Sequence, residues 1–209
     1  MANYTAQDVK ALRERSGAGM MDCKAALDEA DGNLDKAMEV LRLKGLKGVT
    51  KREGRTTSNG LIVARVNGGT GYLIELACET DFVAKAAKFI ELADKVADAI
   101  AAAGATTLEA ALAADLGGKS VQDAINDEAA IMGEKVELRK VGSLKDAAVD
   151  AYMHRTSKDL PPQVGVLVAY SGSDADTAHD VAVHIAAFSP SVLKREDVDA
   201  DVVATERRI

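Results

Sequence analysis

The stretch CETDFVAKAAKFIELADKVADAIAA, residues 78–102, joins the end of an apolar strand to a long amphipathic segment. The run before it, YLIELAC at 72–78, has the composition of a β-strand. From Asp81 to about Ala103, apolar residues recur at helical spacing and charged residues occupy the opposite arc. The predicted buried arc comprises Phe82, Val83, Ala86, Phe89, Ile90, Ala93, Val96, Ala97 and Ile100. We therefore expect one amphipathic helix packed on a sheet.

The segments on either side of this corner complete an α+β unit. Upstream, GLIVARV at 60–66 and the 72–78 strand are joined by the glycine-rich NGGTG, which predicts a β-hairpin. Downstream, residues 107–132 are predicted to be helical with a break at Gly117 and Gly118. KVELRKV at 135–141 then alternates apolar and polar residues as a strand does.

A second unit repeats this order in shorter form. AVDAYMH at 148–154 and QVGVLVAY at 163–170 are predicted strands, and a helix follows them. Both units run from an apolar strand through an acidic corner into a helix that ends in VAxxIAA. This internal similarity predicts an α+β fold whose core has two related subdomains with antiparallel sheets, at 60–141 and 142–195.

A head of three short helices is predicted for residues 1–45. Thr5 followed by Asp8 has the pattern of an N-cap with an acid in the first turn, and Asn33 has the pattern of the cap of the third helix. The ends of the three helices are predicted from glycine turns, at Gly17, Asp31-Gly32 and Gly45. A unit this small buries little area and often serves to dock a partner.

Two further segments lack a packed pattern. Residues 46–59, LKGVTKREGRTTSN, are basic and contain Gly, Ser and Thr, so we expect a solvated linker rather than a phosphate-binding segment. Residues 196–209 enter a helical pattern that has no C-terminal cap. We expect them to be the start of a truncated helical segment.

Composition excludes several classes of protein. The 209-residue chain carries a net charge of −7, and residues 1–59 hold 11 basic and 9 acidic side chains, which leaves −9 on the remainder. A nucleic-acid-binding protein would show a dense basic face, so direct nucleic-acid binding is not expected. No apolar run reaches the ~18 residues of a membrane span. Cys23 and Cys78 lie outside any CxxC spacing and residues 1–10 lack a targeting pattern, which predicts reduced thiols and a cytoplasmic location.

The motifs that suggest chemistry all fail on spacing. GGKS at 117–120 lacks the earlier glycine and the preceding strand of a phosphate-binding loop, so a turn between helices is expected. Asp197, Asp199 and Asp201 lack the glycine and glutamate of a calcium loop, and a capped helix start is expected instead. His179 and His184 are five residues apart, which does not stack them as metal ligands. We expect no catalytic residue, no metal and no cofactor, and the chain is predicted not to be an enzyme.

Phe82 admits two interpretations from the pattern alone. It belongs to the apolar arc, so it can be a core residue behind a helix cap at Thr80 or Asp81. Alternatively, the first helical turn overhangs the sheet, and Phe82 projects as an anchor for a partner's pocket. The periodicity does not decide between these two interpretations.

Four motifs in order along the chain resemble the elongation factor Ts family: RERSGAGMMDCKAALDEADGN, CETDFVAK, IMGEKVELRKV, and VGVLVAY followed by VAVHIAAFSP. The likeness covers essentially the whole chain. It implies a guanine nucleotide exchange factor for the translational GTPase elongation factor Tu, with a head similar to a ubiquitin-associated domain. Family members usually continue past the position of Ile209, so the resemblance also implies a C-terminally truncated member.

The resemblance implies roles for particular residues. Thr80, Asp81, Phe82 and Val83 would meet the GTPase near its magnesium site, where Phe82 enters an apolar pocket, Asp81 makes polar contacts and Mg²⁺ is displaced. The head would dock through Arg13, Met20 and Met21, although either methionine can also be a core residue of the head. His154 would lie near the contact with the partner's third domain. A homodimer within a heterotetramer is a further implication.

One rival function rests on the head alone. A three-helix head on an unrelated core would be a helix-docking or ubiquitin-like-binding adaptor without exchange activity. Such a protein would not need the Thr-Asp-Phe-Val corner, so replacing Phe82 would leave its function unchanged.

Overall fold

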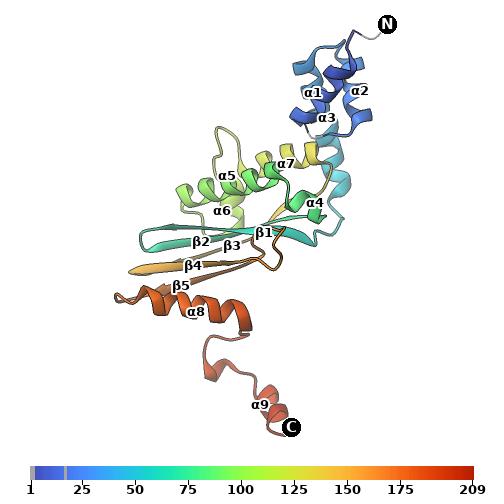
Figure 1. Cartoon of the computed structure of the whole chain (residues 1–209). Coiled ribbons are helices and arrows are strands. Elements are labelled where there is room, and N and C mark those ends of the chain that lie inside the picture. The colour runs from blue at the N-terminus through green and yellow to red at the C-terminus, as the bar shows by residue number, and fades with distance from the viewer. Residues whose placement is uncertain (1–2, 17) are drawn as a thin grey trace.

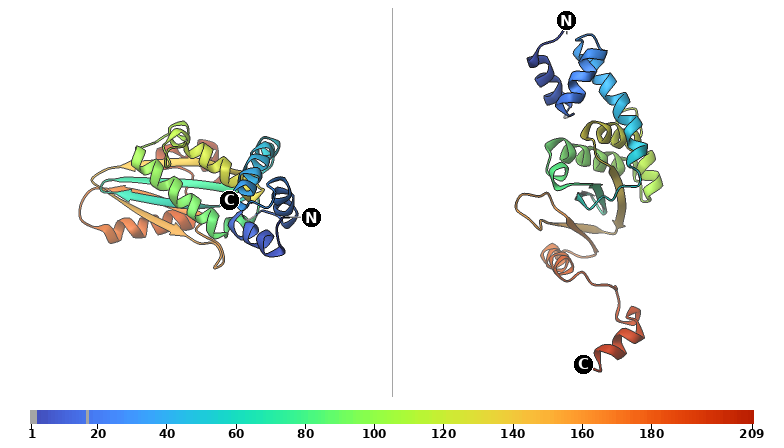
Figure 2. Two further views of the ribbon diagram at one scale, coloured as in Figure 1. Left: turned by 90° about the horizontal axis from the view of Figure 1, so that it is seen from above. Right: turned by 90° about the vertical axis from the view of Figure 1, so that its right-hand side faces the viewer.

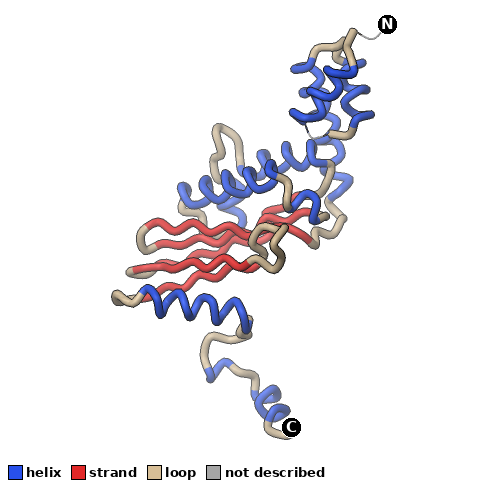
Figure 3. The backbone as a smooth tube through the Cα atoms, in the orientation of Figure 1, coloured by secondary structure: helices blue, strands red, loops and turns tan. Residues whose placement is uncertain are grey.

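The computed structural model describes residues 3–16 and 18–209, apart from the side chains of residues 46, 47, 49 and 50. The chain forms an α+β fold in successive layers (Figures 1 and 3). A helical head leads into a layer of helices, which covers one face of a three-stranded sheet. A two-stranded sheet lies against the other face, and a single helix covers its outer side.

The head consists of α1 (Ala6–Ser16), α2 (Met20–Glu29) and α3 (Leu34–Arg52). Its small core contains Leu12, Cys23, Ala26, Leu27, Ala37 and Leu41 and is separate from the main core. The N-cap prediction is confirmed, because the Asp8 amide donates to Thr5 Oγ1 at 3.3 Å while Asp8 Oδ2 accepts the Thr5 amide at 2.7 Å. Asn33 caps α3 by accepting the Asp35 and Lys36 amides. The helix end predicted at Gly17 lies outside the described residues.

The predicted end of the third helix at Gly45 is wrong, because α3 continues to Arg52 and takes in the first half of the predicted linker. The reason is helix packing: α3 lies against α7 (Val121–Met132). A Cβ built on Gly45 would lie 2.6 Å from the Cβ and from the carbonyl oxygen of Ala130. Gly45 is therefore the point of close approach between the two helices rather than a helix terminator.

The central sheet has the order β1-β2-β3 and is antiparallel, formed by β1 (Asn59–Asn67), β2 (Thr70–Cys78) and β3 (Val136–Lys145). The predicted hairpin is confirmed, and Gly68 adopts the positive φ of 58° that its two-residue turn requires. One face of the sheet contributes Leu61, Tyr72, Ile74 and Leu76 to the main core.

Four helices cover this face: α4 (Asp81–Ala84), α5 (Ala87–Ala103), α6 (Leu108–Ala113) and α7. The buried side chains of α5 are Phe89, Leu92, Ala93, Val96, Ala97 and Ile100. The predicted break at 117–118 is also confirmed, since a turn there separates α6 from α7 and Ser120 caps α7.

The second unit consists of β4 (Ala148–His154), β5 (Val164–Tyr170) and α8 (Ala175–Phe188). The two strands pair antiparallel as expected. Glycine lets this hairpin approach the central sheet, because a Cβ on Gly165 would lie 2.8 Å from both Ile62 and Leu73. Beyond α8 the chain leads away from the layers through a 3₁₀ turn, Arg195–Asp197, to α9 (Ala200–Glu206), as Figure 2 shows. Among the described residues, none of the helices combines the length and apolar character needed to cross a membrane.

An ion pair and a hydrogen bond tie the head to the core. Asp127 on α7 accepts from Arg42 of α3 at 3.0 Å and from Lys119 at 2.8 Å. Lys88 at the start of α5 donates to the carbonyl oxygen of Arg15 in α1. Burial acts to raise the pKa of Asp127, but the hydrogen bonds from Lys119 and Arg42 outweigh it, so the pKa lies below its ordinary value.

Two glycines of α3 test the close approach with opposite expected signs. Gly45→Ala should lower the free energy of unfolding by about 1–3 kcal/mol, because its methyl group would collide with Ala130. Gly48→Ala faces only the flexible guanidinium of Arg52 and should be neutral or stabilise by up to about 1 kcal/mol. Urea unfolding of both variants measures the difference, and equal losses would contradict the packing explanation.

The Asp127 ion pairs should make the stability of the folded chain sensitive to acid. A carboxylate whose pKa is lowered by folding stabilises the fold above its unfolded pKa, and this contribution is lost as pH falls through the folded value. Asp127→Asn should therefore lower the thermal midpoint at pH 7, with the difference from the unmodified chain shrinking below about pH 4. A difference that stays constant from pH 7 to pH 3 would show that the charge on Asp127 is unimportant.

Candidate functional site

The corner between β2 and α4 presents one large apolar side chain to solvent. Thr80 is the N-cap of α4, and its Oγ1 accepts the Val83 amide at 3.4 Å. Ala84 is fully buried and Val83 packs partly against the main core, so these two residues fix the turn to the body. Phe82 lies on the opposite side of the turn and is 73% exposed. The interpretation of Phe82 as a core residue is therefore wrong.

The predicted single helix from Asp81 to Ala103 is also wrong, and its break explains the exposure of Phe82. α4 ends at Ala84 with Lys85 as its C-cap, and Ala86 has an extended backbone with ψ of 134° before α5 begins. No Gly or Pro marks this break. In one continuous helix, Phe82 and Phe89 would share a face at i and i+7. The break rotates Phe82 out of the arc and leaves Phe89 fully buried.

Lys85 interacts with both neighbours that the resemblance singles out. Its Nζ lies 3.2 Å from Asp81 Oδ2 and 4.6 Å from the centroid of the Phe82 ring. A cation over an exposed ring contributes about 0.5–1 kcal/mol. The exposed ring and the carboxylate are therefore held beside each other by one side chain.

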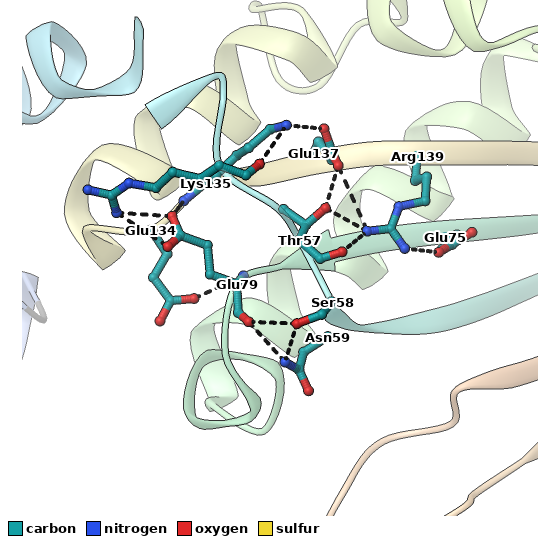
Figure 4. A network of polar contacts seen from close by, with 10 residues as sticks. Thr57, Ser58, Asn59, Glu75, Glu79, Glu134, Lys135, Glu137 and Arg139 are labelled. Carbon is teal, nitrogen blue, oxygen red and sulfur yellow. Dashed lines mark hydrogen bonds and ion pairs between the residues drawn. The ribbon is translucent and has the colours of Figure 1, made fainter. Parts of the chain in front are cut away.

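A polar network supports the corner from behind (Figure 4). The Glu134 carboxylate, at the start of the segment leading into β3, accepts three hydrogen bonds from Glu79 and Thr80. Glu79 in turn accepts the Lys135 amide at 2.6 Å and binds Arg55 at 3.2 Å. The ends of β2 and β3 are thus joined by side chains beyond the last ladder pair.

The network continues across the sheet to Arg139. Its guanidinium binds Glu75 at 2.8 Å and donates to the carbonyl and hydroxyl oxygens of Thr57. The Thr57 hydroxyl also donates to Glu137 Oε1 at 2.5 Å. Burial acts to raise the pKa of Glu137, but hydrogen bonds from Thr57 and Lys135 lower it below its ordinary value. These contacts anchor Thr57, near the end of the predicted linker, to the sheet.

The head residues implied by the resemblance lie on its surface. Arg13 on α1 is exposed, and Met20 and Met21 at the start of α2 are 61% and 74% exposed. The interpretation of either methionine as head core is therefore wrong. Flexible, exposed thioethers suit an adaptable docking surface.

His154 ends β4, and its Nδ1 lies 3.1 Å from the Tyr152 hydroxyl. The loop that follows it, residues 155–163, lies at the same end of the layers as the corner, where Pro162 accepts the Ile62 amide. The corner and His154 thus occupy one end of the layered core, in different layers.

The remaining motifs take structural roles. Asp199 caps α9 by accepting the Asp201 amide, as expected for a helix start. His179 pairs with Asp150 at 3.1 Å. Within residues 3–16 and 18–209, no three His, Cys, Asp or Glu side chains converge as metal ligands would.

Cys78 reports on the packing of the corner. Burial, together with the nearby Glu134 carboxylate, raises the pKa of its thiol to about 12. The thiol should therefore resist iodoacetamide at pH 8 in the folded chain and react at once in denaturant. Mass spectrometry of the labelled peptide measures this, and rapid labelling without denaturant would show that the corner opens.

Comparison with known proteins places the chain in a family. The family model described as elongation factor TS matches residues 79–209. The elongation factor Ts of Paenarthrobacter aurescens (strain TC1) is 58% identical over 212 residues, covering 100% of this chain and 76% of the relative. Those of Pseudarthrobacter chlorophenolicus and Micrococcus luteus are 59% and 58% identical with the same coverage. The chain belongs to the elongation factor Ts family.

Proposed function

We propose that this protein is a guanine nucleotide exchange factor for elongation factor Tu in the cytoplasm, and that the corner at 80–83 drives release of GDP. Family membership supports the general role. The observation that carries the mechanism is the 73% exposure of Phe82 on a turn whose other apolar residues are packed into the body. A rigidly mounted, exposed aromatic ring is the kind of side chain that dominates binding energy at interfaces.

In this mechanism, Phe82 enters an apolar pocket of the GTPase beside its magnesium site, and Asp81 makes polar contacts next to it. Mg²⁺ and the phosphate-binding loop hold GDP jointly, so displacing an adjoining segment removes several charge-assisted contacts together. The exposed Met20, Met21 and Arg13 of the head provide a second docking surface, and His154 a third. Pairing of two complexes into a heterotetramer stays a prediction.

The factor needs no covalent chemistry. It works by binding the nucleotide-free GTPase more tightly than the GDP-bound form. Linkage then requires that GDP weakens binding of the factor by the same ratio by which the factor weakens binding of GDP. Nucleotide rebinding therefore releases the factor.

Release of fluorescent GDP from purified elongation factor Tu at fixed Mg²⁺ tests the proposal. The unmodified chain should accelerate GDP release. The rate stimulated by Phe82→Ala should be about 30-fold lower, as expected for a hot-spot residue that contributes about 2 kcal/mol. Phe188→Ala is the matched control, because Phe188 is 71% exposed at the C-terminal end of α8, a helix on the other face of the sheets from α4. It should leave the rate within about twofold.

Two outcomes would contradict the proposal. If the chain binds the GTPase but leaves GDP release at its spontaneous rate, the protein is a docking module without exchange activity. If exchange occurs and Phe82→Ala retains it, Phe82 is not the side chain that drives GDP release.

A further inference from the structure

We propose that Glu134 is a positioning residue for the corner: its carboxylate fixes the N-terminus of α4 so that Phe82 projects in one direction. The inference rests on the proposed function of Phe82. The helix α4 has only four residues and breaks before α5. A single helical turn is not stable on its own, so its geometry must be imposed from outside.

Glu134 supplies that constraint through three hydrogen bonds. Its Oε2 accepts the Glu79 amide at 3.1 Å and the Thr80 amide at 3.0 Å, and its Oε1 accepts the Thr80 hydroxyl at 2.5 Å. The last paired residues of β2 and β3 are Cys78 and Val136. Beyond them, the carboxylate takes the place of backbone carbonyls and fixes two consecutive amides.

The Thr80 hydroxyl links Glu134 to the helix cap. It has one proton, which it gives to Glu134, and its lone pairs then face the Val83 amide at 3.4 Å. The carboxylate therefore orients the hydroxyl as an acceptor at the position where the cap needs one. Without Glu134, the hydroxyl is free to rotate its proton toward the helix and lose the cap.

Glu79 bonds back to the segment that carries Glu134. Its carboxylate accepts the Lys135 amide, next to Glu134, and binds Arg55. Each glutamate thus binds the backbone at or beside the other, and the two segments are joined in both directions (Figure 4). Only Glu134 also binds the cap residue of α4, so its loss should act on Phe82 directly.

Glu134 should raise the affinity for the GTPase through preorganisation. A Phe82 side chain that is already oriented spends none of its binding energy on ordering its own turn. A corner that samples several directions presents Phe82 correctly for only part of the time, and the effective affinity falls by that fraction.

Exchange kinetics with three variants test the role. Glu134→Ala should slow stimulated GDP release about tenfold, since it removes three hydrogen bonds to a charged group. Glu134→Gln retains an oxygen for both amides, but its NH₂ cannot accept the Thr80 proton, so its rate should fall between those of the unmodified chain and Glu134→Ala. Glu91→Ala, on the exposed side of α5, is the control and should have no effect.

A double-mutant cycle separates positioning from general destabilisation. If Glu134 acts through Phe82, Glu134→Ala should cause almost no further loss in a Phe82→Ala background. An equal further loss in that background would overturn the proposal. Should Glu134→Ala fail to fold, Thr80→Val is the second variant: it removes the Thr80 hydroxyl, and with it both the bond to Glu134 and the cap of α4, and should show the same non-additivity.

A measurement without the GTPase keeps the inference separate from the proposed function. In the free chain, hydrogen exchange followed by NMR should show the Thr80 and Val83 amides exchanging about tenfold faster in Glu134→Ala, with the amides of α5 unchanged. Unchanged protection at Thr80 and Val83 would overturn the positioning role, even if the chain is an exchange factor. Faster exchange in a chain that does not stimulate GDP release would refute the proposed function while leaving the positioning of the corner intact.

Discussion

Packing of α5 on one face of the three-stranded sheet is the interaction on which the other parts depend. Phe89, Val96 and Ile100 are fully buried there against Ile74 and Leu76 of β2. Burying each such side chain contributes about 1.5–3 kcal/mol. α7 belongs to the same layer, and α3 of the head packs on α7. The corner that carries Phe82 is the short connection between the sheet and this helix layer.

Features specified by neighbouring residues were predictable from the sequence. The Thr5 and Asn33 caps, the hairpin turn at Gly68 and the break before Ser120 all follow from local side-chain chemistry, and the structure has them. The likeness of the head to a ubiquitin-associated domain and the boundaries of the subdomains stay predictions. Features that depend on distant residues were not predictable. Gly45 has the residue type of a helix end, and only its contact with Ala130 reveals a packing role.

In the candidate site, too, the features that depend on distant residues were not predictable from the sequence. Periodicity placed Phe82 in the buried arc, because nothing in the composition of residues 81–103 signals a break after Ala84. The family resemblance implied a partner contact at Phe82, which stays a proposal, and the structure shows that this side chain is exposed. Glu134 was missed although its motif was recognised. Its partners are set by the pairing of β2 with β3, and no sequence spacing links Glu134 to Thr80.

The place of β2 in the sheet has a mechanical consequence. In the proposed mechanism Phe82 pushes into another protein, and an equal reaction force then acts on the strand that carries the corner. The corner follows directly from β2, which is the central strand and is hydrogen-bonded along its length to β1 and to β3. Any component of the reaction along β2 loads both ladders in shear, so many backbone hydrogen bonds must yield together. If the corner followed an edge strand, a single ladder would carry this load.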